Sequence, residues 1–283
     1  MNYENRNYRC RESWVFLGKY FRLNNLKVTG YYDVNENLAK EAATFTETTF
    51  IEDLETIVKI SDTLFLTVPD DLITTVWNQM KDMSLEGKFI CHCSGALSAG
   101  DAFPGIDKCG AFGYSVHPLF AVSDKYNSYK ELSHAYFVIE GDEKHREEIA
   151  GIFNNLGNEV RYIAAKDKVK YHCAAAVCSN HVVALIQESL DLMQECGFDE
   201  ESALKALAPI MLGNMQHIAE RGTVNSLTGP VERADVKTVE KHLNCLDEKQ
   251  QMLYRLLSEV LISIGEKKKS GQRLWKAKTH SRK

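Results

Sequence analysis

The stretch "DTLFLTVPDD", residues 62–71, decides the fold. Residues 63–68 form a run without charged side chains, which is typical of a strand buried on both faces of a parallel sheet. Pro69 ends this strand, and Asp70 or Asp71 is placed to cap a helix that continues through "LITTVWNQM". A buried strand that passes directly into a helix is the repeating unit of an α/β fold.

Further strand patterns lie on both sides of this unit. They fall at residues 26–33, 87–95, 110–118, 134–142 and 159–163, and segments of helical composition separate most of them. Strand and helix therefore alternate from about residue 27 to residue 163, which predicts a doubly wound parallel α/β sheet.

The pattern changes at residue 164, after which no strand is predicted. Residues 166–197 are predicted to form a single long helix that ends at Gly197, and three more helices follow. The second of the four is predicted to bend at Pro209 and Gly213. The predicted organisation is an α/β domain over 1–163, an all-α domain over 164–266 and a basic, poorly ordered tail over 267–283.

Composition and charge exclude several classes of protein. The net charge of −5 includes eight Lys and Arg in the tail, so residues 1–266 carry 26 basic against 39 acidic side chains. This acidic body argues against nucleic-acid binding, and a solvated tail is favoured over one that touches RNA or lipid.

The sequence shows no secretory signal, no apolar run long enough to span a membrane and no C-x-x-C pair. We therefore expect a cytoplasmic protein with buried, reduced thiols.

Five motifs, in a fixed order, resemble one known family. They are "LTVPDD", "HCSG", "SVHPL", "DKVKYHCAAAVCSNHVVAL" and "LTGPVERADVKTVEKHL". The family comprises provisionally assigned NADP-dependent oxidoreductases with a Rossmann-like domain followed by a helical domain of unknown function. It is distantly similar to pyrroline-5-carboxylate reductase and the 3-hydroxyacid dehydrogenases. The resemblance covers residues 15–264 and implies a Rossmann-like domain, an NADP or NAD cofactor, and a homodimer formed through the helical domain.

The chain departs from the family at its beginning. A dinucleotide-binding domain opens with an apolar strand and a G-x-G-x-x-G turn that lets the backbone approach the pyrophosphate. Here the three glycine positions fall on Arg9, Arg11 and Trp14, and the strand position falls on the polar "ENRNY". Two explanations stay open: cofactor binding has been lost or altered, or the first 14 residues are an aberrant start, such as a shifted reading frame.

Residues at the ends of two predicted strands are candidates for cofactor binding. Asp33 ends a strand 19 residues after Trp14, where an acid commonly bonds the ribose of NAD and repels the 2′-phosphate of NADP. Val68, Pro69 and Asp70 follow the most apolar strand, at the sheet edge where ligands bind in such folds. The structural alternatives are a turn at Asp33 and a helix cap at Asp70.

The segment "CHCSG" offers a polar site directly after another strand. Because strand side chains alternate, Cys91 and Cys93 are expected on one face and His92 on the other, which is poor geometry for zinc, and we predict no metal. Ser94 and Gly95 lie past the strand, where a hydroxyl and a backbone N–H suit a nicotinamide or substrate group.

Histidines and their neighbours are the candidates for proton transfer. His117 ends a strand, and His172 lies on the long helix; both suit acid–base work near neutral pH, and both could instead be structural. On an unbroken helix Ser179 lies within about 20° of His172, so Ser179 could bind substrate and Asn180 could orient it. The related dehydrogenases carry a lysine and asparagines on this helix, and that spacing after Lys170 is not reproduced.

Arg233, in "TGPVERAD", is the last candidate. It could bind a substrate carboxylate, or pair with Asp235 to hold the loop. Together these residues predict an NAD(P)-dependent oxidoreductase that acts on a small carbonyl, imine or hydroxyacid between the two domains. The alternative is a non-catalytic binding or regulatory homodimer that has lost its cofactor.

Overall fold

A computed structural model describes residues 14–122 and 124–280. The chain divides into two compact units, residues 1–184 and 185–283. Arg9 and Arg11, on which two of the missing glycines fall, lie outside the described residues. The division falls later than the predicted domain boundary at residue 164, inside the helical region that follows the last strand.

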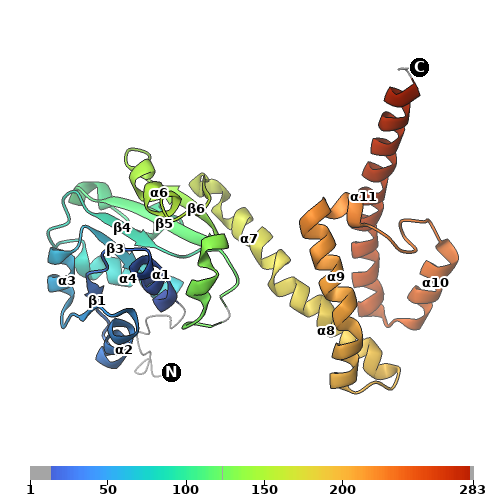
Figure 1. Cartoon of the computed structure of the whole chain (residues 1–283), viewed down its shortest axis with the longest axis horizontal. Coiled ribbons are helices and arrows are strands. Elements are labelled where there is room, and N and C mark those ends of the chain that lie inside the picture. The colour runs from blue at the N-terminus through green and yellow to red at the C-terminus, as the bar shows by residue number, and fades with distance from the viewer. Residues whose placement is uncertain (1–13, 123, 281–283) are drawn as a thin grey trace. The chain divides into compact units, whose positions relative to one another are not determined.

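The first unit is built on a five-stranded sheet (Figure 1). Its order is β3 (Thr63–Leu66), β4 (Phe89–His92), β5 (Phe112–Leu119), β6 (Tyr136–Gly141) and β7 (Val160–Tyr162). All neighbours are parallel except β5 and β6, which pair antiparallel from Tyr114↔Gly141 to Leu119↔Tyr136. The α/β class is confirmed, and the sheet is mixed, because β6 runs antiparallel to β5 while the other neighbouring strands are parallel.

Two strands stand apart from this sheet. β1 (Gly30–Tyr31) pairs with β2 (Thr49–Phe50) in a separate parallel sheet, although both belong to the predicted alternation of strands and helices. In the described ranges, β1 and β3 are each the end strand of their own sheet. The doubly wound sheet is therefore interrupted between β1 and β3.

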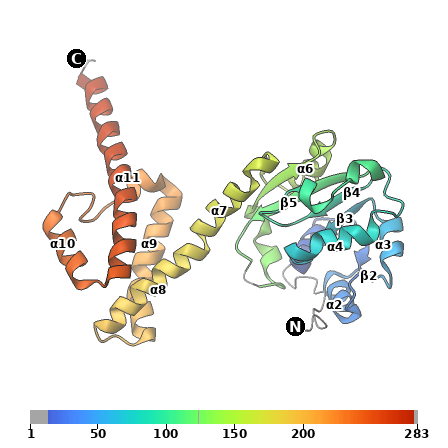
Figure 2. The same ribbon diagram turned by 180° about the vertical axis from the view of Figure 1, so that it is seen from behind.

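Helices cover both faces of the five-stranded sheet (Figure 2). The helices of this unit are α1 (Val15–Leu23), α2 (Glu36–Thr46), α3 (Leu54–Ile60), α4 (Asp70–Met80), α5 (Ala99–Ala102), α6 (Arg146–Asn154) and α7 (Lys168–Cys178). One apolar cluster joins α1 and α6 to Cys91 and Cys93 of the β4 region. The other joins α4 and α5 to Ile90 of β4. Alternate residues of β4 thus face opposite cores, as predicted.

The start of α4 corrects one prediction. Pro69 is the N-cap residue, and the helix begins at Asp70 without a side-chain cap. The Asp70 carboxylate lies in the first turn, where a negative charge favours the helix dipole, and it accepts a hydrogen bond from the Ser94 hydroxyl at 2.6 Å. Asp70 therefore joins two strand ends instead of capping its own helix.

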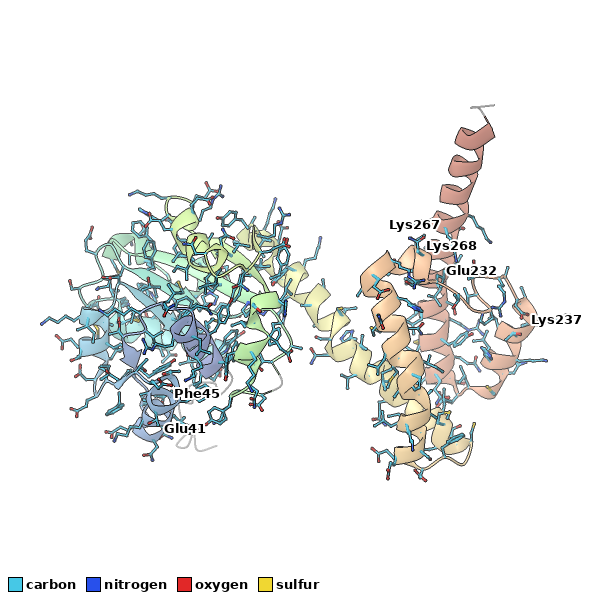
Figure 3. All side chains as sticks on the ribbon, in the orientation of Figure 1. Glu41, Phe45, Glu232, Lys237, Lys267 and Lys268 are labelled. Carbon is cyan, nitrogen blue, oxygen red and sulfur yellow. The ribbon has the colours of Figure 1, made fainter. Side chains whose placement is uncertain are left out.

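The second unit is entirely helical in the part that the structure describes. It comprises most of α8 (Asn180–Glu195), α9 (Glu200–Ser226), α10 (Val236–Cys245) and α11 (Glu248–His280). Lys268 of α11 donates to the Leu227 carbonyl at 2.9 Å and pairs with Glu232 at 3.3 Å, which fastens the loop after α9 (Figure 3).

Several helix predictions need correction. The predicted single helix over 166–197 is broken at Ser179, whose ψ of −78° separates α7 from α8. In α9 the non-helical residue is Gly222, with φ at 74°, and Pro209 lies inside the helix. The basic tail, expected to be poorly ordered, continues α11 as far as His280.

The helical unit buries very few of its own side chains. Between residues 185 and 270, only Leu190, Ala203, Leu227 and Gly265 are buried. The cysteines of the helical region are also exposed, contrary to prediction, namely Cys173, Cys178, Cys196 and Cys245. One segment, Ala165–Glu195, is long and apolar enough to span a membrane by length and composition, with a mean hydropathy of 1.2 and 6% of the window buried. A single helix of this kind is weak evidence for a membrane span, which the sequence analysis does not predict.

Candidate active site

A cavity of about 90 Å³ lies where β3 and β4 end. Six of the candidate site residues line it, namely Val68, Asp70, Ser94, Gly95, His117 and His172. All six belong to the first unit. The carboxyl ends of neighbouring parallel strands meet at one edge of a sheet, which explains why segments distant in sequence converge here.

The turn after β4 is held by the side chains of two residues. The Ser94 hydroxyl donates to Asp70 at 2.6 Å and accepts the backbone N–H of Leu97 at 3.0 Å. The Ser94 backbone N–H donates to Nδ1 of His92 at 3.1 Å. Nδ1 of His92 is therefore the unprotonated nitrogen, and burial lowers the pKa of this histidine to about 3. His92 is a neutral structural residue behind the turn.

Gly95 brings two imidazoles close to the backbone. A Cβ atom at this position would lie 2.4 Å from Cδ2 of His172 and 2.9 Å from Nε2 of His117. The centroids of these two rings are 6.1 Å apart. Only a residue without a side chain allows this approach, so Gly95 sets the width of the site.

His117 is oriented by a partner that the sequence analysis does not single out. Its Nδ1 lies 2.8 Å from the hydroxyl oxygen of Tyr171 on α7. Burial, with the nearby Lys168 charge, lowers the pKa of His117 to about 4. Burial raises the pKa of Tyr171, so the phenol keeps its proton. Near pH 7 this pair is a neutral imidazole fixed by a phenol, and its other ring nitrogen, Nε2, is the one near Gly95.

Lys168, at the start of α7, is a second residue that sequence reasoning misses. It is only 1% exposed, and its Nζ donates to the Ser94 carbonyl at 3.1 Å and to the Ser115 hydroxyl. Burial lowers its pKa to about 8, although Glu140 and Asp70 oppose the shift. Lys168, Tyr171 and His172 follow the i, i+3, i+4 spacing of one helix face, a signal that the sequence contains.

A buried polar row runs across the sheet beneath the site. The strand register places His92 opposite Ser115, and Ser115 opposite Glu140. Glu140 accepts the backbone N–H of Ala99 at 2.8 Å, and burial raises the pKa of its carboxyl group. Because Lys168 donates to Ser115, the row contains a charged side chain that lies behind the Ser94–Gly95 turn.

The remaining candidate site residues do not line this cavity. Asp33 is buried after β1, where it accepts the Asn35 N–H at 2.7 Å, and Pro69 is the N-cap of α4. The Ser179 hydroxyl donates to the Ala175 carbonyl at 2.8 Å, and neither Ser179 nor Asn180 lines the cavity. Arg233 lies in the second unit, between α9 and α10, and its charge helps to lower the pKa of Asp235 after the stronger effect of bonds from Thr238.

A dinucleotide fits the described residues at its nicotinamide half. The cavity offers the Ser94 hydroxyl and the open backbone of Gly95 beside two imidazoles, which suits a carboxamide and its substrate. Trp14, which stands at the position that the resemblance assigns to the third glycine, also lines this cavity, and its ring stacks on Phe16 with centroids 5.5 Å apart. The other two positions of that turn lie outside the described residues.

Comparisons with known proteins agree on the architecture. A family model, the domain of unknown function DUF2520, matches residues 135–261. The protein TM1727 from Thermotoga maritima has a similar structure, with a TM-score of 0.69 and 26% identity over 90% of this chain and 96% of that one. A Bacteroides fragilis protein provisionally named an NADP oxidoreductase, BF3122, matches with a TM-score of 0.65 and 18% identity over 88% and 93%.

More distant likeness is seen in pyrroline-5-carboxylate reductase from Coxiella burnetii. The TM-score is 0.60 and the identity 12%, over 91% of this chain and 95% of the reductase. No curated protein matches the sequence. The chain therefore carries a match to DUF2520 over residues 135–261 and shares its fold, an α/β part followed by a helical part, with these solved structures.

Proposed function

We propose that the protein is an NAD(P)-dependent oxidoreductase acting on a small carbonyl, imine or hydroxyacid. The observation that carries this proposal is the meeting of two imidazoles at Gly95, in a cavity at the carboxyl ends of β3 and β4. Ligands of open α/β sheets bind at this edge. The fold of the provisionally named NADP oxidoreductase and of pyrroline-5-carboxylate reductase supports the same reaction class.

The residues of the site would have the following roles in the proposed reaction. A bound nicotinamide supplies or accepts the hydride. Asp70 holds the Ser94 hydroxyl, so that the turn presents a fixed backbone at Gly95. His117, neutral and fixed by Tyr171, hydrogen-bonds the substrate oxygen or nitrogen through Nε2. His172 is exposed to solvent and carries the proton in or out.

Cofactor selection is proposed to rest on Asp33 and on the segment Val68–Asp70. Asp33 is buried directly after β1, in the position from which an acid reaches the adenine ribose. A carboxylate there disfavours a 2′-phosphate, so we expect NADH to bind more tightly than NADPH. Asn180, Ser179 and Arg233 remain proposed substrate contacts, as the sequence suggests.

Titration with NADH and NADPH, followed by nicotinamide fluorescence, tests the proposal. We expect saturable binding that Asp33→Asn weakens for NADH and that the matched variant Asp62→Asn, on an exposed loop, leaves unchanged. Absence of saturable binding of either cofactor up to millimolar concentration would favour the alternative, a binding or regulatory protein without redox chemistry. The absence of the G-x-G-x-x-G turn from its expected position is the observation that supports this alternative.

We further propose that the chain is a homodimer through its helical unit. That unit leaves large apolar side chains open to solvent, with Leu212 70%, Met252 66%, Ile210 61% and Val260 57% exposed. A unit with so few buried residues cannot offset the entropy of folding alone, so a second copy is needed to cover it. Sedimentation analysis should find a dimer that Leu212→Glu dissociates and that Asn214→Glu, on another side of α9, does not.

A further inference from the structure

The backbone N–H of Gly95, in the turn after β4, has no acceptor among the residues that the structure describes. Its neighbours in the turn are satisfied. The Ser94 N–H donates to Nδ1 of His92 at 3.1 Å. The Ser94 hydroxyl accepts the N–H groups of Ala96 and Leu97 at 3.3 and 3.0 Å. Gly95 is buried and lines the cavity of about 90 Å³, and a buried N–H without an acceptor is costly, so this group is free to bind a ligand.

The carbonyl of the same peptide group is held by two buried donors. Nζ of Lys168 lies 3.1 Å from the Ser94 carbonyl oxygen, and the Ser115 hydroxyl lies 3.0 Å from it. The peptide bond is trans, so its C=O and N–H groups point in opposite directions. Because the carbonyl points to Lys168, which does not line the cavity, the Gly95 N–H points the other way, towards the cavity that Gly95 lines.

Lys168 and Ser115 make the Gly95 N–H a stronger donor than an ordinary peptide group. Hydrogen bonds in a chain polarise one another, and a charged donor on the carbonyl draws electron density from the peptide nitrogen. Lys168 is only 1% exposed, so water screens its charge weakly. The Gly95 N–H is therefore suited to an acceptor on which negative charge develops.

His117 supplies a second donor beside the first. A Cβ atom on Gly95 would lie 2.9 Å from Nε2 of His117, so this nitrogen stands next to the Gly95 main chain. Nδ1 of His117 contacts the Tyr171 hydroxyl at 2.8 Å, and the phenol has no other hydrogen-bond partner in the described part of the chain. We assign the phenol proton to this contact, which places the imidazole proton on Nε2.

We propose that the Gly95 N–H and the Nε2–H of His117 together bind the oxygen of a carbonyl substrate. Lys168 and Ser115 are then positioning residues, which act through the peptide group. The inference rests on the proposed function and narrows its substrate class to a carbonyl compound and the corresponding alcohol.

The reaction explains why two donors are needed at one oxygen. The carbonyl carbon gains a hydride from the reduced nicotinamide, which becomes oxidised, and the π electron pair moves to the oxygen. That oxygen then takes the proton that His172 carries in. The two donors face the oxygen while it is negative, which is the arrangement of an oxyanion hole. An iminium nitrogen carries hydrogen in place of lone pairs, so the same donors would repel it.

The Gly95 amide can be observed almost alone by nuclear magnetic resonance. The chain contains two Ser–Gly pairs, at 94–95 and 270–271, so ¹³C in the serine carbonyl and ¹⁵N in glycine together select two signals. Gly271, on α11, is the internal reference. The probes are acetamide, whose carbonyl oxygen accepts hydrogen bonds, and acetamidinium, which has the same shape but carries a charged NH₂ donor in place of the oxygen. Each is titrated into the full chain saturated with NADH.

We expect acetamide to move the Gly95 signal downfield and to leave the Gly271 signal in place. Acetamidinium should bind roughly tenfold more weakly or not at all. Lys168→Met and Ser115→Ala should each weaken acetamide binding roughly fivefold and reduce the downfield shift, whereas Lys170→Met, on the exposed surface, should do neither. If one of the two positioning variants fails to fold, the other decides.

Several results would overturn the inference while NADH still binds. They are a Gly95 signal that acetamide does not move, equal affinity for the two probes, and acetamide binding that both positioning variants leave intact. A Gly95 signal that NADH alone moves fully would also overturn it, because the nicotinamide carboxamide would then hold the N–H. Failure of NADH itself to bind, measured by nicotinamide fluorescence, would instead overturn the proposed function.

Discussion

Nδ1 of His117 lies 2.8 Å from the hydroxyl oxygen of Tyr171, and this contact joins the end of β5 to the first turns of α7. The phenol fixes the plane of an imidazole whose pKa of about 4 keeps it neutral near pH 7. Under the proposed function, Tyr171 would be a positioning residue that acts on the substrate through His117.

Tyr171→Phe should therefore lower turnover roughly 5- to 50-fold while changing KM little, because the imidazole loses its orientation but stays in place. The lost hydrogen bond should cost about 1 kcal/mol of unfolding free energy. Steady-state kinetics and denaturant unfolding measure the two effects. An unchanged kcat in a folded Tyr171→Phe protein would remove Tyr171 from the mechanism.

Gly95→Ala should disable the site without unfolding the protein. The added methyl group would lie 2.4 Å from the His172 ring and 2.9 Å from the His117 ring, so at least one ring must move. We expect a loss of turnover of roughly 100-fold. Gly151→Ala is the matched control: its Cβ would meet no atom within 4 Å on α6, and the change should leave turnover intact and slightly raise the unfolding free energy.

Loss of the Lys168 proton should lower the activity at alkaline pH. Its pKa of about 8 means that the proton bonded to the Ser94 carbonyl is lost as the pH rises through that value. We expect kcat to fall above about pH 8. The Lys168→Met variant should have a lower kcat at every pH, and its kcat should not fall further above pH 8. Lys170→Met, two residues later on the exposed surface, should keep the wild-type profile. If the kcat of Lys168→Met still falls above pH 8, the alkaline loss of activity is due to another titratable group.

The unfolding free energy should fall in mild acid. The folded-state pKa of His117, about 4, is below the ordinary value of 6.5, so the unfolded chain binds more protons between these values. Stability present above pH 6.5 is therefore lost as the pH falls towards 4, on the order of 3 kcal/mol from this group. Urea unfolding across that range should be less pH-dependent in His117→Gln than in His181→Gln, which changes an exposed histidine on α8.

Replacing residues 1–13 with an apolar strand and a G-x-G-x-x-G turn should raise the affinity for NADH. The strand would enter a cavity of about 300 Å³ that lies between β1 and β3, and the turn would present backbone N–H groups at the start of α1. We expect at least a tenfold gain, measured by nicotinamide fluorescence. The same strand with a turn of serines is the control, and equal gains from both would show that the glycines are not the missing element.

Much of this protein could be predicted from local sequence patterns. The apolar run at 63–68 predicts a buried strand, and the alternation in "FICHC" predicts that Cys91 and His92 face opposite cores, which the structure confirms. These predictions succeed because the period of side-chain burial depends on backbone geometry within one element. The candidates Ser94, Gly95 and His117 follow from the same reasoning, since strand ends of such sheets meet at one edge.

Other features depend on contacts between distant segments, which no local pattern encodes. The family resemblance points to Lys170, yet the buried lysine is Lys168, whose side chain reaches Ser115 of β5. Asp70 has the spacing of a helix cap, but a bond to Ser94 decides its role. Ser179 and Asn180 lie seven and eight residues after His172, about 10 to 12 Å along a helix, and neither lines the cavity that His172 lines.

The sequence by itself determined the α/β and all-α halves, the motif order and the loss of the glycine turn, because these follow from side-chain chemistry along one chain. Only the tertiary structure decided that His117, His172 and Gly95 meet, that Lys168 is buried beneath them and that β1 and β3 belong to separate sheets. Those facts depend on the packing of segments far apart in sequence, where sterics and desolvation act between elements.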